Sequence, residues 1–374
     1  MAPRLRNNSE RAQLNLFRAL GGDFAPRDAQ DLMAYPFFSL AKSPRIIPID
    51  FQLNEITIRV EAVPEHGMAT IWDADILIWA ASQIVEARDA GLPTSRLMAA
   101  TPYEILNFIG RGTGARDYER LRAALDRLQS TTVATSLRQI GKRRMHRFSW
   151  INEWGERSDT NGKSDGIDLI LPDWFYRAVL DDGLVLTIDP AYFRLNGGLE
   201  RWLYRLVRKH AGRQPTGWRF DLRHLYLKSG VLSAFDRFTF EVRRIVRRQT
   251  LPGYRLRLEQ SASKRTFLAF CREKRSADPR CKKLWISCGK PVDTVVLSGM
   301  DSDVPSGRSL TCYREQKTYF LPIKTDGFGT RNLDSNLKES NSFLGEPNGP
   351  HWKAGKEKGQ GASERDDPGG EGAP

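Results

Sequence analysis

Cysteine and histidine are scarce in this sequence, and their spacing excludes several classes of protein. The four cysteines are Cys271, Cys281, Cys288 and Cys312, and none of the five histidines stands within two positions of another. There is no Cys-x-x-Cys pair, so the sequence predicts neither a zinc module nor the disulfide framework of a small secreted protein. There is no His-x-His pair either, and we expect no metal site and no cofactor.

Long hydrophobic runs are also missing. No stretch approaches the roughly 18 apolar residues of a membrane-spanning helix, and residues 1–10 are polar and basic, unlike a signal peptide. We therefore expect a cytoplasmic protein without membrane contact. The chain can still build a sizeable core, because 40% of its 374 residues are hydrophobic and 10% are aromatic. At roughly 150 residues per domain, its length suggests about two or three domains.

The motifs of nucleotide-binding and DNA-nicking enzymes are absent. A Gly-Lys-Ser run stands at 162–164, but a phosphate-binding loop needs a glycine where Arg157 stands. The glycine-rich turn at 110–114 follows no apolar strand, so it is not a dinucleotide loop. A nicking enzyme needs a metal site and a nucleophilic tyrosine, whereas we expect Tyr204 and Tyr226 in the core or at its edge. The sequence therefore predicts a protein that is not an enzyme.

Positive charge is concentrated in one segment. The whole chain carries a formal net charge of +13, and residues 196–275 alone hold 20 Lys/Arg and 6 Asp/Glu, a net charge of +14. Residues 1–195 hold 24 and 25, and residues 276–374 hold 14 of each. A compact basic segment is the footprint of a polyanionic partner, most simply nucleic acid. A solvated basic face without a partner is the alternative.

Composition divides the chain into four parts. Residues 1–34 are polar with weak helical spacing, and we expect a flexible arm. Residues 35–190 and 191–275 are expected to form two domains. Residues 276–374 hold 13 of the 31 glycines and 8 of the 20 prolines without a sustained apolar period, which predicts a mostly disordered tail.

The first domain is expected to contain a helix–turn–helix followed by a hairpin. Thr101, Pro102 and Glu104 together mark a helix start, since they supply a cap, a favoured first residue and a capping box. A second helix is predicted over 115–129. Two strand-like runs then flank a turn at Gly141-Lys142 and are expected to form a hairpin over 131–154. This order is the signature of a winged helix.

The same order recurs in the second domain. Helical spacing predicts helices over 198–210, 221–227 and 233–249, and alternation predicts strands over 254–258 and 265–270. The predicted fold class is therefore α+β, with two tandem winged-helix domains.

The helix over 233–249 is the candidate reading helix. Its apolar stripe is formed by Phe235, Phe238, Val242 and Ile245, and its other faces carry Arg237, Arg243, Arg244, Arg247 and Arg248. Arginine suits a major groove, where it pairs bidentately with guanine or clamps phosphates. The alternatives are a solvated arginine-rich helix and one that binds an acidic protein.

Further DNA contacts are expected from two other places. Lys264 and Arg265 stand at the tip of the second hairpin, where a wing would touch backbone phosphate. The first domain is expected mainly to mediate self-association and partner contact, with secondary DNA contact through Arg111, Arg116 and Arg120.

Several blocks of the sequence resemble those of a known family. They are Tyr35-Pro-Phe-Phe-Ser39, Pro48-Ile-Asp50, Thr70-Ile-Trp-Asp73, Gly110-Arg-Gly-Thr-Gly114, Asp117-Tyr-Glu-Arg-Leu121, Ala124-Leu-Asp-Arg-Leu128, Leu199-Glu-Arg-Trp-Leu-Tyr-Arg205, Lys209-His-Ala-Gly212 and Leu251-Pro-Gly-Tyr-Arg255. Together they resemble the plasmid replication initiator protein A family over about residues 35–258. The resemblance implies tandem winged-helix domains, binding to repeated sites in the double-stranded DNA of a plasmid origin, and help in opening the duplex. It also implies recruitment of the host replication initiator and helicase machinery and no intrinsic catalysis. We further expect a monomer–dimer equilibrium.

Two alternatives remain open at this point. A transcriptional repressor without an initiation role would share every DNA-binding feature above, and only the family resemblance separates it from an initiator. A nicking enzyme of rolling-circle replication is disfavoured by the dispersed histidines. The pattern of protected sites on the flanking plasmid DNA distinguishes the first two, because direct repeats beside an AT-rich stretch indicate an initiator and one inverted repeat over a promoter indicates a repressor.

Overall fold

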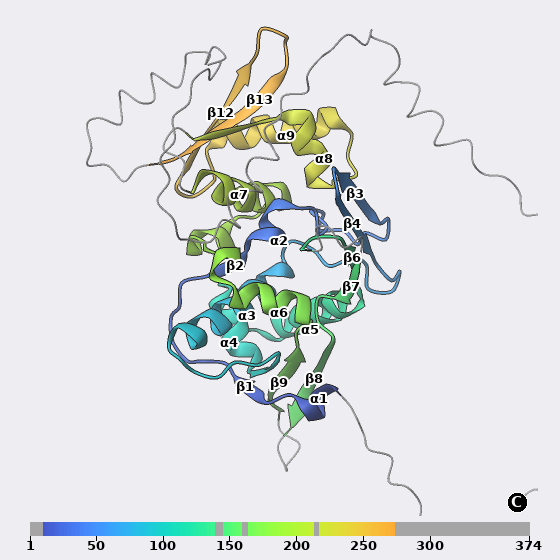
Figure 1. The fold of residues 1–374 in the computed structure, drawn as a ribbon, viewed down its shortest axis with the longest axis vertical. Helices are drawn as coiled ribbons and strands as arrows, with labels where there is room; N and C mark the ends of the chain where they lie inside the picture. Colours follow the sequence, from blue (N-terminus) through green and yellow to red (C-terminus); the bar gives the residue numbers. More distant parts are fainter. Residues whose placement is uncertain (1–9, 139–144, 159–163, 213–216, 274–374) are drawn as a thin grey trace, which may run out of the picture. The chain divides into compact units, whose positions relative to one another are not determined.

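The computed structural model describes residues 10–138, 145–158, 164–212 and 217–273. They fold as a mixed α+β protein with several small sheets (Figure 1). The buried apolar side chains form two clusters, one drawn from residues 17–179 and the other from residues 188–270 together with Met33 and Ile78. We call residues 10–187 the first lobe and residues 188–273 the second lobe.

The first lobe is built on short helices and strands. Its helices are α1 (Glu10–Gln13), α2 (Gln30–Ala34), α3 (Ala74–Asp89), α4 (Pro102–Phe108), α5 (Ala115–Ser130) and α6 (Asp173–Leu180), with a 3-10 turn at Asp182–Leu184. Its strands are β1 (Leu16–Arg18), β2 (Arg27–Ala29), β3 (Ile49–Leu53), β4 (Ile56–Glu61), β5 (Leu97–Ala100), β6 (Thr132–Thr135), β7 (His146–Ser149), β8 (Glu153–Ser158), β9 (Ser164–Ile170) and β10 (Val185–Thr187). The strands form sheets in the orders β1-β5-β9-β8 and β3-β4-β6-β7, and β2 pairs with β10.

The predicted helix start at Thr101 is confirmed. The Thr101 hydroxyl accepts a hydrogen bond from the Glu104 amide at 3.2 Å, and the Glu104 carboxylate accepts one from the Thr101 amide at 2.7 Å. Pro102 is the first residue of α4. This reciprocal capping box satisfies two amide groups that the start of a helix leaves without intrahelical partners.

The second lobe has fewer elements. They are a 3-10 turn (Pro190–Arg194), α7 (Gly198–Ala211), β11 (Trp218–Asp221), α8 (Leu222–Ser229), α9 (Phe235–Arg248), β12 (Tyr254–Gln260) and β13 (Thr266–Arg272). The sheet has the order β11-β13-β12 and is antiparallel throughout. The predicted helices and strands of this region are all present, with small shifts of their ends.

The two lobes contain the same sequence of elements. In the first lobe, α3, β5, α4, α5, β8 and β9 occur in this order, with β6 and β7 inserted between α5 and β8, and the strand neighbours are β5-β9-β8. In the second lobe, α7, β11, α8, α9, β12 and β13 follow with neighbours β11-β13-β12. The hairpin that matches β12–β13 is therefore β8–β9.

This match corrects the hairpin predicted over 131–154. The two runs do pair, as β6 with β7, but they belong to a separate sheet with β3 and β4. The second of these pairing strands, β7, ends just before Trp150. Trp150 is fully buried, and its amide donates to the Leu128 carbonyl at 3.1 Å. The chain then enters β8, so one predicted strand is two strands in different sheets.

The predicted arm over residues 1–34 is wrong for its described part, residues 10–34. Strand β1 pairs in parallel with β5, and Phe17 within it is only 5% exposed. Strand β2 pairs with β10, and Leu32 and Met33 of α2 are buried. These elements are three to five residues long, which is too short for a hydrophobic period to reveal. The predicted tail over residues 276–374 lies outside the described residues.

Buried ion pairs connect the lobes through α7. The Arg205 guanidinium donates to both carboxylate oxygens of Asp28 in β2, at 2.6 and 2.8 Å, and these side chains are 1% and 2% exposed. One helical turn earlier, Arg201 contacts both oxygens of Asp75 in α3 at 2.8 Å. Burial raises the pKa of the Asp28 and Asp75 carboxyl groups, and the arginines oppose that shift. The second lobe is thus held to the first by charge pairs that water does not reach.

A second contact joins the lobes at the end of α8. Gly230 ends this helix with a φ of +62°, and a Cβ atom there would lie 2.8 Å from the Pro36 side chain. A glycine is therefore required for both the turn and the close approach. The Gly230 carbonyl accepts a hydrogen bond from the Arg45 guanidinium, which also binds the Pro48 carbonyl at 3.0 Å. This contact fixes the α8–α9 turn against the first lobe.

Candidate nucleic-acid interface

Helix α9 buries one face and exposes the other. Phe238, Val242 and Ile245 are at most 2% exposed and enter the second core, as their spacing predicts. Phe235 is half-buried against Tyr226, with ring centres 5.5 Å apart. The opposite face carries five exposed arginines, which are Arg237, Arg243, Arg244, Arg247 and Arg248. The structure therefore brings together, on one face of one helix, all five of the predicted DNA-binding arginines of this segment.

These arginines fall into two groups. Arg237 and Arg244 both form ion pairs with Glu241, at 2.7 and 2.5 Å. Glu241 lies between them along the helix, so it holds two guanidinium groups on one stripe. The other three arginines form no ion pair with any residue that the structure describes; they are Arg243, Arg247 and Arg248. Their charge is balanced by no protein carboxylate in that part of the chain.

The end of α9 is tied to the following hairpin. Gln249 has a φ of +49° and ends the helix. Its side-chain amide donates to the Leu256 carbonyl at 2.7 Å, and its side-chain carbonyl accepts from the Leu256 amide at 2.9 Å. This pair of bonds fixes strand β12, and with it the hairpin, relative to the exposed face of α9.

The hairpin tip is narrow and basic. The Ser261 amide donates to the Arg265 carbonyl at 2.9 Å, and the Lys264 amide donates to the Ser261 carbonyl at 2.9 Å. Lys264 and Arg265 are exposed, and among the described residues neither side chain has an ion-pair partner. In contrast, Arg255 of β12 pairs with Glu273 at 2.8 Å. The tip therefore presents positive charge that no described carboxylate balances, whereas Arg255 in the strand is paired.

Helix α5 of the first lobe matches α9 in position but not in charge balance. Arg120 pairs with Asp117 at 3.1 Å, Arg122 pairs with Glu156, and Arg127 pairs with Asp73 at 2.8 Å. Arg116 is exposed and has no ion-pair partner in the described part of the chain.

Arg111 is only partly exposed, and its guanidinium binds groups of the first lobe. Its guanidinium donates to the Trp72 carbonyl at 2.7 Å and to the buried Asp75 carboxylate at 3.0 Å. The side chain is turned into the lobe and binds the same carboxylate as Arg201. The guanidinium is therefore already paired within the lobe, with a buried carboxylate 36 positions earlier in the chain, and Arg111 is not among the DNA contacts that we propose.

One residue of the exposed face was missed by sequence reasoning. Phe240 lies among the arginines of α9 and is 48% exposed. Its position is out of phase with the stripe that contains Phe238 and Val242. That mismatch was the available signal, because a large apolar residue outside the buried stripe of an amphipathic helix has to face solvent or a partner.

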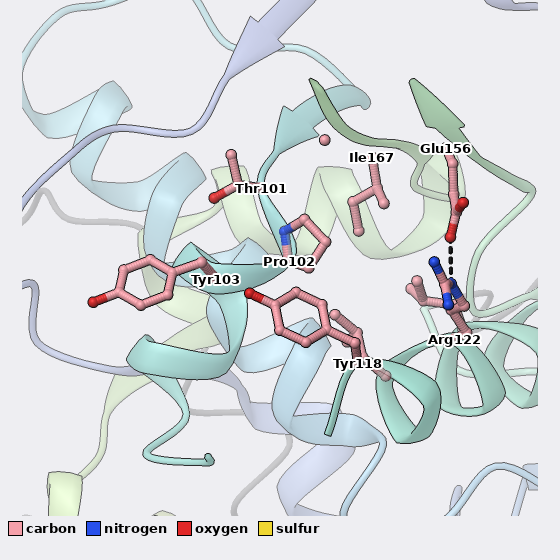
Figure 2. A pocket seen from close by; sticks show the side chains of 10 residues that line it. Thr101, Pro102, Tyr103, Tyr118, Arg122, Glu156 and Ile167 are labelled. Carbon is pink, nitrogen blue, oxygen red and sulfur yellow. Dashed lines mark hydrogen bonds and ion pairs between the residues drawn. The ribbon is translucent and has the colours of Figure 1, made fainter. Parts of the chain in front are cut away.

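A pocket of about 450 Å³ lies in the first lobe between α4, α5 and the β8–β9 hairpin (Figure 2). Tyr103 and Tyr118 line one side, and the ion pair between Arg122 and Glu156 lies at the other. Because these two charged groups are bound to each other, the pocket shows no arrangement of a free acid and base. Among the described residues, no cluster of His, Cys, Asp and Glu could hold a metal ion.

The two tyrosines considered as nucleophiles occupy structural positions, as expected. Tyr204 is 1% exposed, its hydroxyl accepts from the Asp189 amide at 2.7 Å, and burial raises the pKa of its phenol. Tyr226 lies at the edge of the second core, and its hydroxyl donates to the Ser233 carbonyl at 2.9 Å. In the described part of the chain, no helix is both long and apolar enough to span a membrane.

Comparison with known proteins identifies the family. A "Putative replication protein" of Wigglesworthia glossinidia brevipalpis is 31% identical over 229 residues, which are 60% of this chain and 82% of that protein. The chain is also similar to solved structures of domains 2 and 3 of RctB. The first is 15% identical with a TM-score of 0.48, and the match covers 64% of this chain and 97% of that one. The second is 14% identical with a TM-score of 0.44, and the match covers 65% of this chain and 96% of that one. Residues 27–256 match the family Replication initiator protein A. Since that match takes in more than half of the chain and most of both lobes, the chain belongs to the replication initiator protein A family.

Proposed function

We propose that this protein initiates plasmid replication by binding repeated sites at the plasmid origin, and that the second lobe is a winged-helix unit that supplies most of the affinity for double-stranded DNA. The observation that carries the proposal is the exposed face of α9. Three of its arginines have no carboxylate partner in the described chain. Like charges at this spacing destabilise a helix, a polyanionic partner removes that cost, and the family to which the chain belongs acts in replication.

The geometry suits a helix in the major groove. A B-DNA major groove is about 12 Å wide and admits one α-helix. Arg237 and Arg244, held on one stripe by Glu241, are assigned to base edges. Arg243, Arg247 and Arg248 are assigned to base edges and phosphates, and Lys264 and Arg265 to the phosphate backbone beside the helix.

The first lobe is assigned a different role. Most of the arginines on α5 are already paired, so this lobe is expected to contribute self-association and contact with the host replication initiator and helicase machinery. Arg116 and Arg120 remain candidates for a secondary contact with DNA. We assign the protein to the cytoplasm and to a monomer–dimer equilibrium, with duplex opening following the binding of several copies.

Footprinting on the plasmid that carries the gene tests this proposal. The full chain is compared with Arg243→Ala/Arg247→Ala/Arg248→Ala and with a charge-matched control, Arg59→Ala/Arg122→Ala/Arg177→Ala. The control removes three arginines whose side chains are 46%, 55% and 77% exposed on the first lobe. We expect protection of several direct repeats beside an AT-rich stretch, lost in the α9 variant and retained in the control.

Other outcomes would contradict the proposal. Equal loss in both variants would mean that net charge, and not the α9 face, drives binding. One protected inverted repeat over a promoter would indicate a repressor. Incubation with supercoiled origin plasmid and Mg²⁺ is expected to leave the plasmid intact, and a covalent tyrosyl–DNA adduct would instead indicate a nicking enzyme.

A further inference from the structure

Phe240 stands within the most basic surface of α9. Asp236, Phe240, Arg243 and Arg247 follow at steps of four, three and four, which places them on one stripe of the helix. The Arg237 guanidinium lies over the Phe240 ring, with its central carbon 5.5 Å from the ring centre. The ring is thus flanked by arginine side chains on the surface assigned to the major groove.

Folding of the second lobe does not account for this ring. Phe238, two positions earlier, is 1% exposed and belongs to the second core, whereas Phe240 is 48% exposed and is not part of that core. About half of the Phe240 surface stays exposed, so packing within the lobe does not explain why this residue is aromatic. An exposed aromatic side chain within a charged face is typical of a binding surface.

We propose that Phe240 contacts the 5-methyl group of a thymine in the major groove, and so makes a thymine at one position of the binding site a determinant of specificity. The inference rests on the proposed function of α9. The thymine methyl is the apolar group that the major groove presents, and phenylalanine is among the side chains that contact it. The cation–π contact with Arg237 holds the ring in place.

Double-stranded DNA fits this surface better than an apolar patch on a protein does. An apolar protein patch would cover Phe240 but would leave the neighbouring arginines desolvated without counter-charges, which is costly. A duplex provides both an apolar contact and counter-charges, because the thymine methyl contacts the ring while phosphates and guanine edges bind the arginines.

The test removes one methyl group. The full-length chain is first used to select a preferred duplex from a randomised library, and each thymine of that duplex is then replaced singly by deoxyuridine, which lacks only the 5-methyl group. We expect one position at which the replacement weakens binding about fourfold, equivalent to about 0.8 kcal/mol for one buried methyl group. Phe240→Ala should weaken binding to the thymine duplex by at least that factor and abolish the difference between the two duplexes.

Two further variants keep the result interpretable. Phe240→Leu retains an apolar side chain and should keep part of the thymine preference. Tyr103→Ala removes an aromatic ring that is 55% exposed on the first lobe and should keep the full preference. Thermal melting checks that each variant is folded, and the half-exposed position of Phe240 predicts little change.

Each other outcome overturns the inference in a recognisable way. If no deoxyuridine duplex binds more weakly, no thymine methyl is read. If Phe240→Ala keeps the same preference as the parent, another residue reads the methyl. If selection yields no preferred duplex, the proposed function itself fails, and the inference fails with it.

Discussion

The two lobes repeat one order of elements, yet the third helix of each repeat carries its charge differently. Helix α5 has a formal net charge of +1, and three of its four arginines form ion pairs within the lobe. Helix α9 has a net charge of +3, and three of its five arginines have no such partner in the described chain. The repeated framework alone therefore does not mark a DNA-binding surface. What distinguishes the lobes is whether protein carboxylates already balance the arginines.

The largest expected effect comes from the place where the lobes are joined. Asp28→Asn leaves the buried Arg205 without a counter-charge, and breaking a buried ion pair costs about 3–5 kcal/mol. We expect a loss of that size in the free energy of unfolding, measured by urea denaturation.

Two variants control this prediction. Asp173→Asn removes one partner of an exposed pair on α6, whose side chains are 77% and 52% exposed, and should change stability by less than about 0.5 kcal/mol. The double variant Asp28→Asn/Arg205→Met replaces the unpaired charge with an apolar side chain and should recover much of the loss. A cost below 1 kcal/mol for Asp28→Asn would show that the lobes do not depend on this pair.

The next largest effect compares two matched arginines. Arg244 on α9 and Arg120 on α5 each pair with a carboxylate three positions earlier, and both are exposed. Arg244→Ala should reduce the discrimination between origin and random DNA by about 1–3 kcal/mol, because a base contact is lost. Arg120→Ala should leave that discrimination unchanged.

Affinity on both DNAs at several salt concentrations measures this difference. If Arg237→Ala, Arg244→Ala and their double variant all keep the parent specificity, α9 is not the reading helix. Helix α5 would then become the better candidate, and the contrast between the lobes would be reversed.

A pH effect is expected from the second lobe. His210 packs between Trp218 and Phe220, with ring centres 5.9 and 4.9 Å away, and His224 stacks on Phe220 at 5.7 Å. Burial lowers the pKa of His210 well below its ordinary value and that of His224 to about 4, and nearby lysine charge adds to both shifts. Below about pH 6.5 the unfolded chain therefore takes up protons that the folded lobe does not, so stability falls as the pH falls.

For His210 the expected loss between pH 7 and pH 6 is about 0.7 kcal/mol. Denaturation of the parent and of His210→Gln at both pH values measures it, because the variant lacks this titration whatever its absolute stability. A pH dependence that is equal in the two proteins would contradict the prediction.

The smallest effect concerns the hairpin tip. Lys264 has a φ of +60°. Glycine at this position therefore removes the charge and also the backbone strain of a positive φ. Lys264→Gly should weaken binding to all DNA about equally and lower the salt slope by about one unit. A change in specificity would mean that the tip reads sequence.

The order of helices could be predicted where apolar periodicity is long, as in α5, α7 and α9. The stripe of Phe238, Val242 and Ile245 is regular over several turns, so its burial follows from the sequence. Strands β1 and β2 could not be predicted in this way, because each is three residues long and depends on a distant partner strand. The assignment of hairpins to sheets failed for the same reason.

The candidate site was predictable in composition but not in pairing. A count of arginines identifies α9, but it cannot show that Arg111 binds the buried Asp75. It also cannot show that Glu241 binds two arginines at once. These facts depend on which carboxylates the fold places nearby. Phe240 was detectable as a residue out of phase, but only the structure gives its exposure and its contact with Arg237.

The junction between the lobes also has a consequence for how the protein is made. Asp28 and Arg205 are 177 positions apart in the chain, and at about 5–20 residues per second a ribosome takes roughly 10–35 s to synthesise that interval. Strand β2 is likewise synthesised long before its partner strand β10, by most of the same interval. During translation the first lobe therefore has an incomplete sheet until β10 has been synthesised, and an unpaired Asp28 carboxylate until α7 has been synthesised. Its folding is completed by the lobe that follows it.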